Sequence, residues 1–235
     1  MAASARLRTF ATREDLAAEL AATVSDRLRE AIKSRGSATL AVSGGTTPAL
    51  FFEALSHENL DWAKVIVTLV DERFVPPSSE RSNERLVREK LLKNEARLAR
   101  FVGLYSDATD VDEAARRSEA GVALLGSPLD VVVLGMGTDG HTASFFADAP
   151  NIDDLTNPSQ ARRVLPVDTA SSGEPRLTLT MPLIANARFL ALHIEGDAKR
   201  GVLDRAIAEK TTTLPIRMVA NSAASGLNVY SARTG

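Results

Sequence analysis

Short apolar runs alternate with amphipathic helical patterns along most of this chain. Residues 64–70 (KVIVTLV) and 129–134 (LDVVVL) are almost entirely apolar, which is typical of strands covered on both faces. Further strands are predicted at residues 6–10, 37–42, 176–180, 188–194 and 227–232. The alternation predicts an α/β fold of the Rossmann-like type, with a mainly parallel central sheet and helices on both faces. We expect one domain over residues 1–235, because no repeat, low-complexity tract or composition break marks a linker.

The longest helical pattern covers residues 12–36. Thr12 can cap its N-terminus, and Gly36 lies just past its end. Shorter helices are predicted at residues 48–55, 83–92, 110–125, 181–187 and 196–210. Residues 71–83 are predicted as a polar loop. Most of residues 148–175, which hold five prolines and glycines, is predicted as irregular chain.

The composition excludes several classes of function. The 235 residues carry a net charge of −2, so no bulk electrostatic field draws the chain to nucleic acid. The absence of cysteine removes disulfides, thiolate zinc sites and cysteine nucleophiles, and agrees with a reducing compartment. We find no signal-peptide pattern and no apolar run of membrane-spanning length. We therefore expect a cytoplasmic protein without nucleic-acid or membrane partners. The sequence does not fix the oligomeric state, and we expect a monomer.

Four polar turns each follow a predicted strand, at residues 43–47, 71–73, 135–141 and 195–199. In an open parallel sheet the carboxyl ends of the strands share one edge, and ligands bind in the crevice there. If these strands are parallel and adjacent, the residues that they carry converge on one site: Gly44, Asp71, Arg73, His141 and Lys199.

The turn SGGTT has the composition of a phosphate site. Gly44 and Gly45 allow the backbone to approach a ligand closely, while Ser43, Thr46 and Thr47 supply hydroxyls. The helix predicted next would direct free N–H groups, with a partial positive charge, into the crevice. A plain tight turn with a helix cap explains these residues equally well. The turn lacks a Walker lysine, so nucleoside triphosphate hydrolysis is not indicated.

The turn GMGTDGH contains Gly135, Gly137 and Gly140, in the spacing of a dinucleotide-binding loop. That fingerprint also needs a second strand with an acid about 20 residues further on, and residues 151–170 are predicted to be irregular. We favour a different interpretation, in which the glycines place His141 in the crevice, at or near the start of a helix. A helix N-terminus keeps an imidazole neutral and able to accept a proton.

His141 is the best candidate for a catalytic base among three histidines. Asp139 could orient its ring or cap the predicted helix. His57 is expected to be exposed, and His193, inside a strand, is expected to be a hydrogen-bonded core residue. No histidine pair has metal-ligand spacing, so no zinc site is predicted.

Asp71 and Arg73 follow the strand at residues 64–70. The acid could bind a sugar hydroxyl or orient a catalytic group, while Arg73 could grip an anion or an oxyanion. A solvated strand end with a local ion pair is the alternative. Arg176 and Lys199 add positive charge. They are candidates only because they are predicted to lie near the crevice.

Five segments of the chain resemble the 6-phosphogluconolactonase family: AVSGGTTP, LVDERFVP, SNERLVREKLL, DVVVLGMGTDGHTASFF and RLTLTMPLIANAR, in this order between residues 41 and 188. The resemblance implies a fold shared with glucosamine-6-phosphate deaminase and ribose-5-phosphate isomerase. It also implies hydrolysis of 6-phospho-D-glucono-1,5-lactone to 6-phosphogluconate in the oxidative pentose phosphate pathway, without a metal or cofactor. The expected partner is this small phosphosugar lactone.

The resemblance makes His141 the general base that takes a proton from the attacking water. Arg73 or backbone N–H groups would stabilise the oxyanion, and His141 would then protonate the departing ring oxygen. Catalytic roles fall to His141, Asp71 and Arg73, and substrate contacts to Ser43, Gly44, Gly45, Thr46, Asp139, Gly140, Arg176 and Lys199. The phosphate would be held by residues 43–47 with help from Arg176 and Lys199, although the sequence does not decide which cation serves the phosphate and which the carbonyl oxygen.

Three other functions fit the sequence less well. Glucosamine-6-phosphate deaminase-like isomerases read DEY in place of DER and carry a glutamate where this chain has Phe146, whose ring cannot shuttle a proton. A non-catalytic sugar-phosphate sensor would not need His141, Asp71 and Arg73 together. A serine esterase usually shows G-x-S-x-G, and Ser43 lacks the first glycine.

The chain departs from the 6-phosphogluconolactonase family at one place. The family continues its histidine motif as SLFP, whereas this chain reads SFFADAP, which predicts a changed loop shape.

Overall fold

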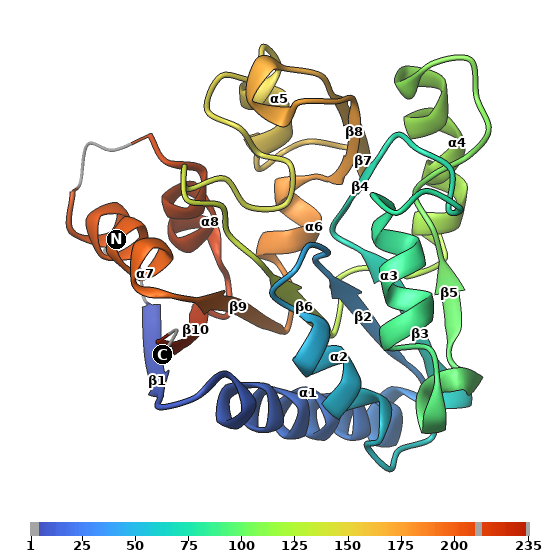
Figure 1. Cartoon of the computed structure of the whole chain (residues 1–235). Helices are drawn as coiled ribbons and strands as arrows, with labels where there is room; N and C mark the ends of the chain where they lie inside the picture. Colours follow the sequence, from blue (N-terminus) through green and yellow to red (C-terminus); the bar gives the residue numbers. More distant parts are fainter. Residues whose placement is uncertain (1–4, 210–212, 234–235) are drawn as a thin grey trace.

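The computed structural model describes residues 5–209 and 213–233 and contains the predicted parallel sheet. Seven strands form this sheet, and every neighbouring pair is parallel (Figure 1). In spatial order they are β1 (Ala5–Phe10), β10 (Leu227–Ala232), β9 (Phe189–Glu195), β6 (Val131–Leu134), β2 (Ala38–Val42), β3 (Val65–Leu69) and β5 (Arg100–Val102). The strands that precede the four polar turns therefore lie in the centre of the sheet, as β9, β6, β2 and β3.

Helices lie on both faces of the sheet. Figure 1 shows α1 and α2 on one face and α6 and α8 on the other, and each of these pairs is in contact. The α-helices are α1 (Arg13–Arg35), α2 (Ala49–Ser56), α3 (Asn83–Lys90), α4 (Val111–Ala123), α5 (Ile152–Thr156), α6 (Met181–Ala185), α7 (Asp197–Ala208) and α8 (Pro215–Ser222). The last residue of the helix predicted at 196–210, Lys210, lies outside the described residues.

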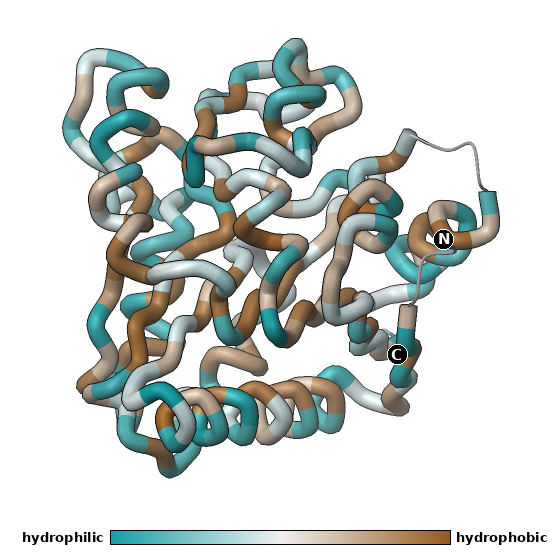
Figure 2. Tube along the Cα trace, turned by 180° about the vertical axis from the view of Figure 1, so that it is seen from behind, coloured by the Kyte–Doolittle hydropathy of each residue, from teal (hydrophilic) through white to brown (hydrophobic). Residues whose placement is uncertain are grey.

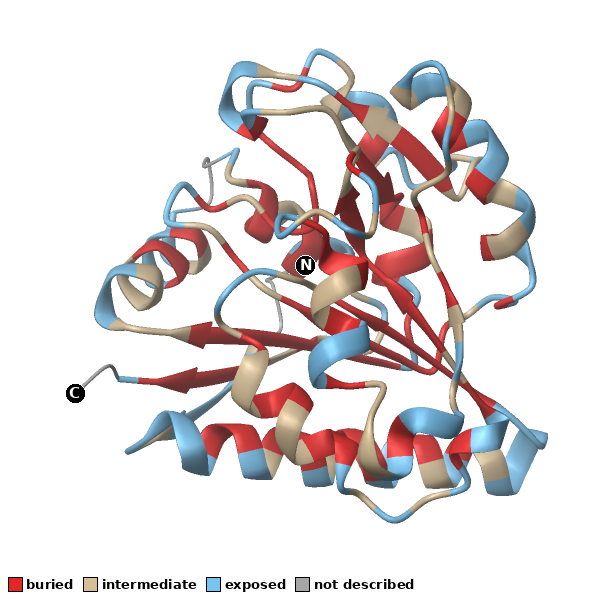
Figure 3. Cartoon of the chain, turned by 45° about the vertical axis from the view of Figure 1, so that its right-hand side comes forward, coloured by how far each residue is buried: buried red, intermediate tan, exposed pale blue. Residues whose placement is uncertain are grey.

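Both predicted caps of α1 are confirmed. The Thr12 side chain accepts a hydrogen bond from the Asp15 N–H, and Gly36 closes the helix with a φ of 82°. Figure 2 shows polar and apolar residues alternating around this helix, and Figure 3 shows its buried side against the sheet. The central strands β2 and β6 are buried along their whole length, as expected for strands covered on both faces.

A second, antiparallel sheet was not predicted. It contains β4 (Asp71–Arg73), β8 (Arg176–Leu179) and β7 (Val164–Val167). The prediction of a loop over residues 71–83 was therefore wrong at its start. The prediction of mostly irregular chain over residues 148–175 missed β7 and α5. The two unpredicted strands, β4 and β7, are short, and β4 is entirely polar. Neither shows the periodic apolar pattern on which strand prediction depends.

No helix begins at His141, so that prediction was also wrong. The chain turns back through Ala143, whose φ is 49°, and Thr142 forms a bridge with Phe145. A dinucleotide loop needs a helix at this point, and the next helix, α5, begins only at Ile152.

The strand β5 and the helix α8 were not predicted. No helix in the described part of the chain is both long enough and apolar enough to cross a membrane.

Candidate active site

A pocket of about 210 Å³ opens at the carboxyl edge of the parallel sheet. The ends of β2, β6 and β9 meet there with β4 and β8 of the second sheet. The residues that line it include most of the predicted site: Ser43, Gly44, Gly45, Thr46, Asp71, Arg73, His141, Arg176 and Lys199. The predicted convergence of the four turns is therefore confirmed, because the strands before them are parallel and adjacent as the prediction assumed.

The turn at residues 43–47 is shaped by its glycines. Gly45 has a φ of 89°, a conformation that favours glycine. At Gly44, an added Cβ would overlap the side-chain amide of Asn83. The Ser43 hydroxyl accepts a hydrogen bond of 2.9 Å from the Gly135 N–H, which ties this turn to the one that carries His141. The two loops therefore form one continuous wall of the pocket.

The His141 ring is held by Asp139. Oδ1 of Asp139 lies 2.6 Å from Nδ1 of His141 and also accepts the His141 backbone N–H at 3.3 Å. Of the two predicted roles for Asp139, the structure places it beside the ring, and there is no helix to cap. Because a carboxylate can only accept a hydrogen bond, Nδ1 carries the hydrogen in this contact, and in the neutral ring the lone pair is then on Nε2.

Gly137 provides the space for this pair. A Cβ at Gly137 would overlap both the His141 ring and the Asp139 carboxylate. The turn is closed by a 2.9 Å hydrogen bond from the Gly137 N–H to the His141 carbonyl. Asp139 and Gly140 are not among the residues that line the pocket: Asp139 contacts Nδ1 of His141, and the Gly140 carbonyl accepts a hydrogen bond from the Ile216 N–H of α8.

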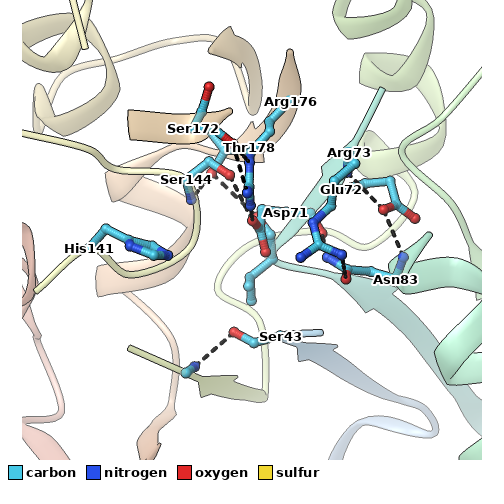
Figure 4. A network of polar contacts seen from close by, with 12 residues as sticks. Ser43, Asp71, Glu72, Arg73, Asn83, His141, Ser144, Ser172, Arg176 and Thr178 are labelled. Atoms are coloured by element: carbon cyan, nitrogen blue, oxygen red, sulfur yellow. Dashed lines mark hydrogen bonds and ion pairs between the residues drawn. The ribbon is translucent and has the colours of Figure 1, made fainter. Parts of the chain in front are cut away.

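Two arginines lie side by side across β4 and β8. Arg73 and Arg176 are register partners, so the sheet presents two guanidinium groups to the pocket. Arg176 lies 3.6 Å from Oδ2 of Asp71, which also accepts a 2.7 Å hydrogen bond from the Ser144 hydroxyl. Figure 4 shows Asp71 between His141 and Arg73. Asp71 is buried and already has partners, so it orients neighbouring groups more readily than it accepts further ones.

Asn83 is a pocket residue that the sequence analysis missed. Its side-chain amide donates to the Asp71 carbonyl at 2.9 Å, and its Oδ1 accepts from Nη1 of Arg73 at 3.0 Å. Asn83 is the first residue of α3 and follows the N-cap Ser82. Asn83 could have been found from the sequence as a polar residue at the start of the helix that follows the 71–73 turn.

The side chain of Glu72, next to Arg73 in the chain, is buried at the N-terminus of α3. Its carboxylate accepts hydrogen bonds from the backbone N–H groups of Arg73, Asn83 and Glu84 at 2.7–2.8 Å, and from the Ser82 hydroxyl at 3.0 Å. Burial raises the pKa of Glu72, although these hydrogen bonds oppose the shift. The Glu72 carboxylate therefore fixes the start of α3, and with it the position of Asn83.

Replacing Glu72 by Gln should destabilise the fold. The amide keeps the size of the side chain but turns an NH₂ group toward backbone donors, which leaves buried N–H groups unpaired. We expect a loss of about 3 kcal/mol in the free energy of unfolding, measured by urea denaturation. Glu80→Gln, at an exposed position in the same loop, is the control and should change stability by less than about 0.5 kcal/mol. Equal stability of the two variants would contradict the role given to Glu72.

Lys199 stands at the side of the pocket formed by residues 43–47. Its Nζ donates to the Thr47 hydroxyl at 3.1 Å. Burial lowers the pKa of Lys199, and the charge of Glu195 partly offsets that shift. A half-buried ammonium beside a glycine turn is suited to an anionic ligand.

The other two histidines behave as predicted. His57 is exposed. His193 is buried, with Nε2 3.2 Å from the Glu195 carboxylate, although it also contributes to the pocket lining. Among residues 5–209 and 213–233, no group of three or more His, Cys, Asp and Glu side chains could hold a metal ion.

Comparison with known proteins identifies the family. The model described as "Glucosamine-6-phosphate isomerases/6-phosphogluconolactonase" matches residues 11–227. A protein of Mesorhizobium japonicum named 6-phosphogluconolactonase is 54% identical over 228 residues, covering 97% of this chain and 95% of the relative. One of the same name from Rhizobium meliloti is 50% identical, covering 97% and 98%. The crystal structure of a 6-phosphogluconolactonase from Shewanella baltica superposes with a TM-score of 0.89 at 34% identity, covering 99% of this chain and 97% of that one. With the parallel sheet and the pocket at its edge, these matches show that the chain belongs to the glucosamine-6-phosphate isomerase/6-phosphogluconolactonase family.

Proposed function

We propose that this chain hydrolyses 6-phospho-D-glucono-1,5-lactone to 6-phosphogluconate in the cytoplasm, with His141 as the general base. The observation that carries this proposal is the Asp139–His141 pair at the rim of a pocket that contains Arg73, Arg176 and Lys199. Relatives named 6-phosphogluconolactonase, up to 54% identical over nearly the whole chain, support the activity. We also propose that residues 1–235 act as one domain and as a monomer.

The reaction begins with a water molecule between His141 and the lactone carbonyl. Nε2 of His141 takes a proton as the water oxygen bonds to the carbonyl carbon. Asp139 stabilises the imidazolium that forms, as a carboxylate on Nδ1 does in other acid–base pairs. The tetrahedral intermediate then collapses, the bond between carbon and ring oxygen breaks, and His141 returns its proton to the departing oxygen. The new carboxylic acid ionises in water.

The cations divide between the two ends of the substrate. Negative charge grows on the carbonyl oxygen, and Arg73 and Arg176 on the second sheet are placed to stabilise it. The phosphate lies against residues 43–47 and Lys199, where backbone N–H groups, hydroxyls and an ammonium are available. Asp71, which accepts from Ser144 and lies 3.6 Å from Nη1 of Arg176, holds Arg176 in place.

The proposal is tested by acid release from freshly made 6-phosphogluconolactone, with unphosphorylated gluconolactone and glucosamine 6-phosphate as comparisons. We expect a large rate gain over buffer with the phosphorylated lactone, a much smaller one without the phosphate, and no ammonia from the amino sugar. No gain with either lactone would remove the hydrolase assignment. An equal gain with both would remove only the phosphate site, and ammonia release would favour the isomerase reaction.

Lys199→Met should separate binding of the phosphate from catalysis. Loss of a charged hydrogen-bond donor should raise KM for the phosphorylated lactone about 10- to 100-fold, with kcat little changed and gluconolactone unaffected. Folding lowers the pKa of Lys199, so the charged ammonium reduces the stability of the ligand-free fold at neutral pH. Without ligand, Lys199→Met should therefore have the same melting temperature as the wild type or a slightly higher one. Arg200→Met is the control, because Arg200 pairs with Asp204 on the same helix and should leave KM unchanged. An unchanged KM in Lys199→Met would contradict the assignment.

A further inference from the structure

One aromatic ring contacts two of the functional side chains in the pocket. Phe146 is 2% exposed, and its ring stacks on the His141 imidazole with centroids 4.4 Å apart and planes 30° apart. The Arg176 guanidinium carbon lies 5.3 Å from the centre of the same ring. The base and one of the cations are therefore both packed against Phe146, although they come from the 135–141 turn and from β8.

The local backbone explains how Phe146 reaches His141 without a helix. A 3.0 Å hydrogen bond from the Phe145 N–H to the Thr142 carbonyl closes a tight turn, which brings residue 146 back to residue 141. The turn is anchored in the second sheet, because the Ser144 hydroxyl donates to Asp71 and its N–H donates to the Thr178 hydroxyl. The Phe146 ring is thus fixed relative to β4 and β8 as well as to the His141 turn.

The chemistry of a phenyl ring suits this place. The face of an aromatic ring carries partial negative charge, so it attracts the Arg176 guanidinium, and also the His141 imidazolium once the base has taken a proton. The ring has no proton to donate and no oxygen to accept one. It therefore supports both groups without hydrogen-bonding to Nε2 of His141 or neutralising Arg176. A carboxylate at position 146 would pair with Arg176 and would hold a proton on Nε2, which a general base must keep free.

We propose that Phe146 is a positioning residue that holds His141 and Arg176 at a fixed separation around the lactone carbonyl. Asp139 fixes which ring nitrogen of His141 is free, and Phe146 fixes where that nitrogen points. This inference rests on the proposed lactone hydrolysis. It adds that the apolar residue after the histidine turn sets the geometry of the reaction, beyond filling the core.

Phe145 offers a matched control for the test. It is the neighbouring residue and fully buried, and in the described part of the chain it makes no ring contact with His141 or Arg176. Phe146→Leu and Phe145→Leu each remove one buried ring from the same turn. Both should lower the melting temperature. Only Phe146→Leu should lower kcat, by about 10-fold, with a smaller rise in KM, because the base and Arg176 lose their common support. Phe146→Tyr keeps the ring face and should restore most of kcat.

A spectroscopic measurement tests the contact without turnover. In the wild-type protein the stacked ring should move the His141 side-chain proton resonances upfield, and Phe146→Leu should abolish that shift while Phe145→Leu retains it. Equal kcat values in the two Leu variants, or no upfield shift in the wild type, would overturn the role of Phe146. A wild-type protein that shows the shift but hydrolyses neither lactone would instead overturn the proposed function.

Discussion

Replacing His141 by Asn is expected to lower kcat about 1,000-fold, while binding of the phosphosugar is largely retained. The amide can keep a hydrogen bond with Asp139 but cannot take a proton from water. Arg73, Arg176 and Lys199 remain in the pocket, so affinity for the product 6-phosphogluconate should change little. The measurements are kcat from acid release and Kd from calorimetry with the product.

His57→Asn is the control for that variant. His57 is exposed at the end of α2 and is not among the residues that line the pocket, so its loss should leave both constants unchanged. If His141→Asn keeps most of its turnover, His141 is not the base. If wild-type turnover is itself absent but the product binds, the chain is a sugar-phosphate sensor.

Gly137→Ala is expected to reduce kcat about 100-fold with the fold intact. The added methyl group would occupy the space of the His141 ring and the Asp139 carboxylate, so one or both must move. Gly137 does not have a positive φ, so alanine brings no backbone strain there. The substitution should therefore lower turnover strongly while it changes the melting temperature only slightly.

Gly135→Ala, two residues earlier in the same turn, is the matched substitution. A Cβ there would meet Ser43 at 3.7 Å, an ordinary van der Waals contact. Most of the activity should remain. Equal losses in the two variants would mean that the turn as a whole is sensitive, and that Gly137 has no special relation to the Asp139–His141 pair.

The parallel sheet could be predicted because its signals are local. Thr12 and Gly36 mark the ends of α1, and the apolar runs of β3 and β6 are long enough to be recognised. The second sheet could not, because β4 is a strand only through its hydrogen bonds to β8, more than a hundred residues away. The buried position of Glu72 could not be predicted either, because its partners are backbone N–H groups of α3 and not side chains that can be recognised in the sequence.

The convergence of the site followed from topology, whereas its internal contacts did not. Parallel neighbouring strands bring Gly44, His141 and Lys199 together whatever the side chains do. In contrast, Asn83 reaches Arg73 only because α3 begins behind β4. The absence of a helix after His141 follows from the Thr142–Phe145 bridge, which no residue pattern announces. The Asp139 carboxylate, and not a helix N-terminus, is therefore the group beside the His141 ring.

The paired arginines on β4 and β8 have a consequence for the end of the proposed cycle. Hydrolysis turns an uncharged ester into a carboxylate, so the product carries more negative charge than the substrate. Arg73 and Arg176 then face an anion that they attract more strongly than the group they first received. We therefore expect 6-phosphogluconate to leave more slowly at low ionic strength, and dissolved salt to accelerate its departure by screening the attraction.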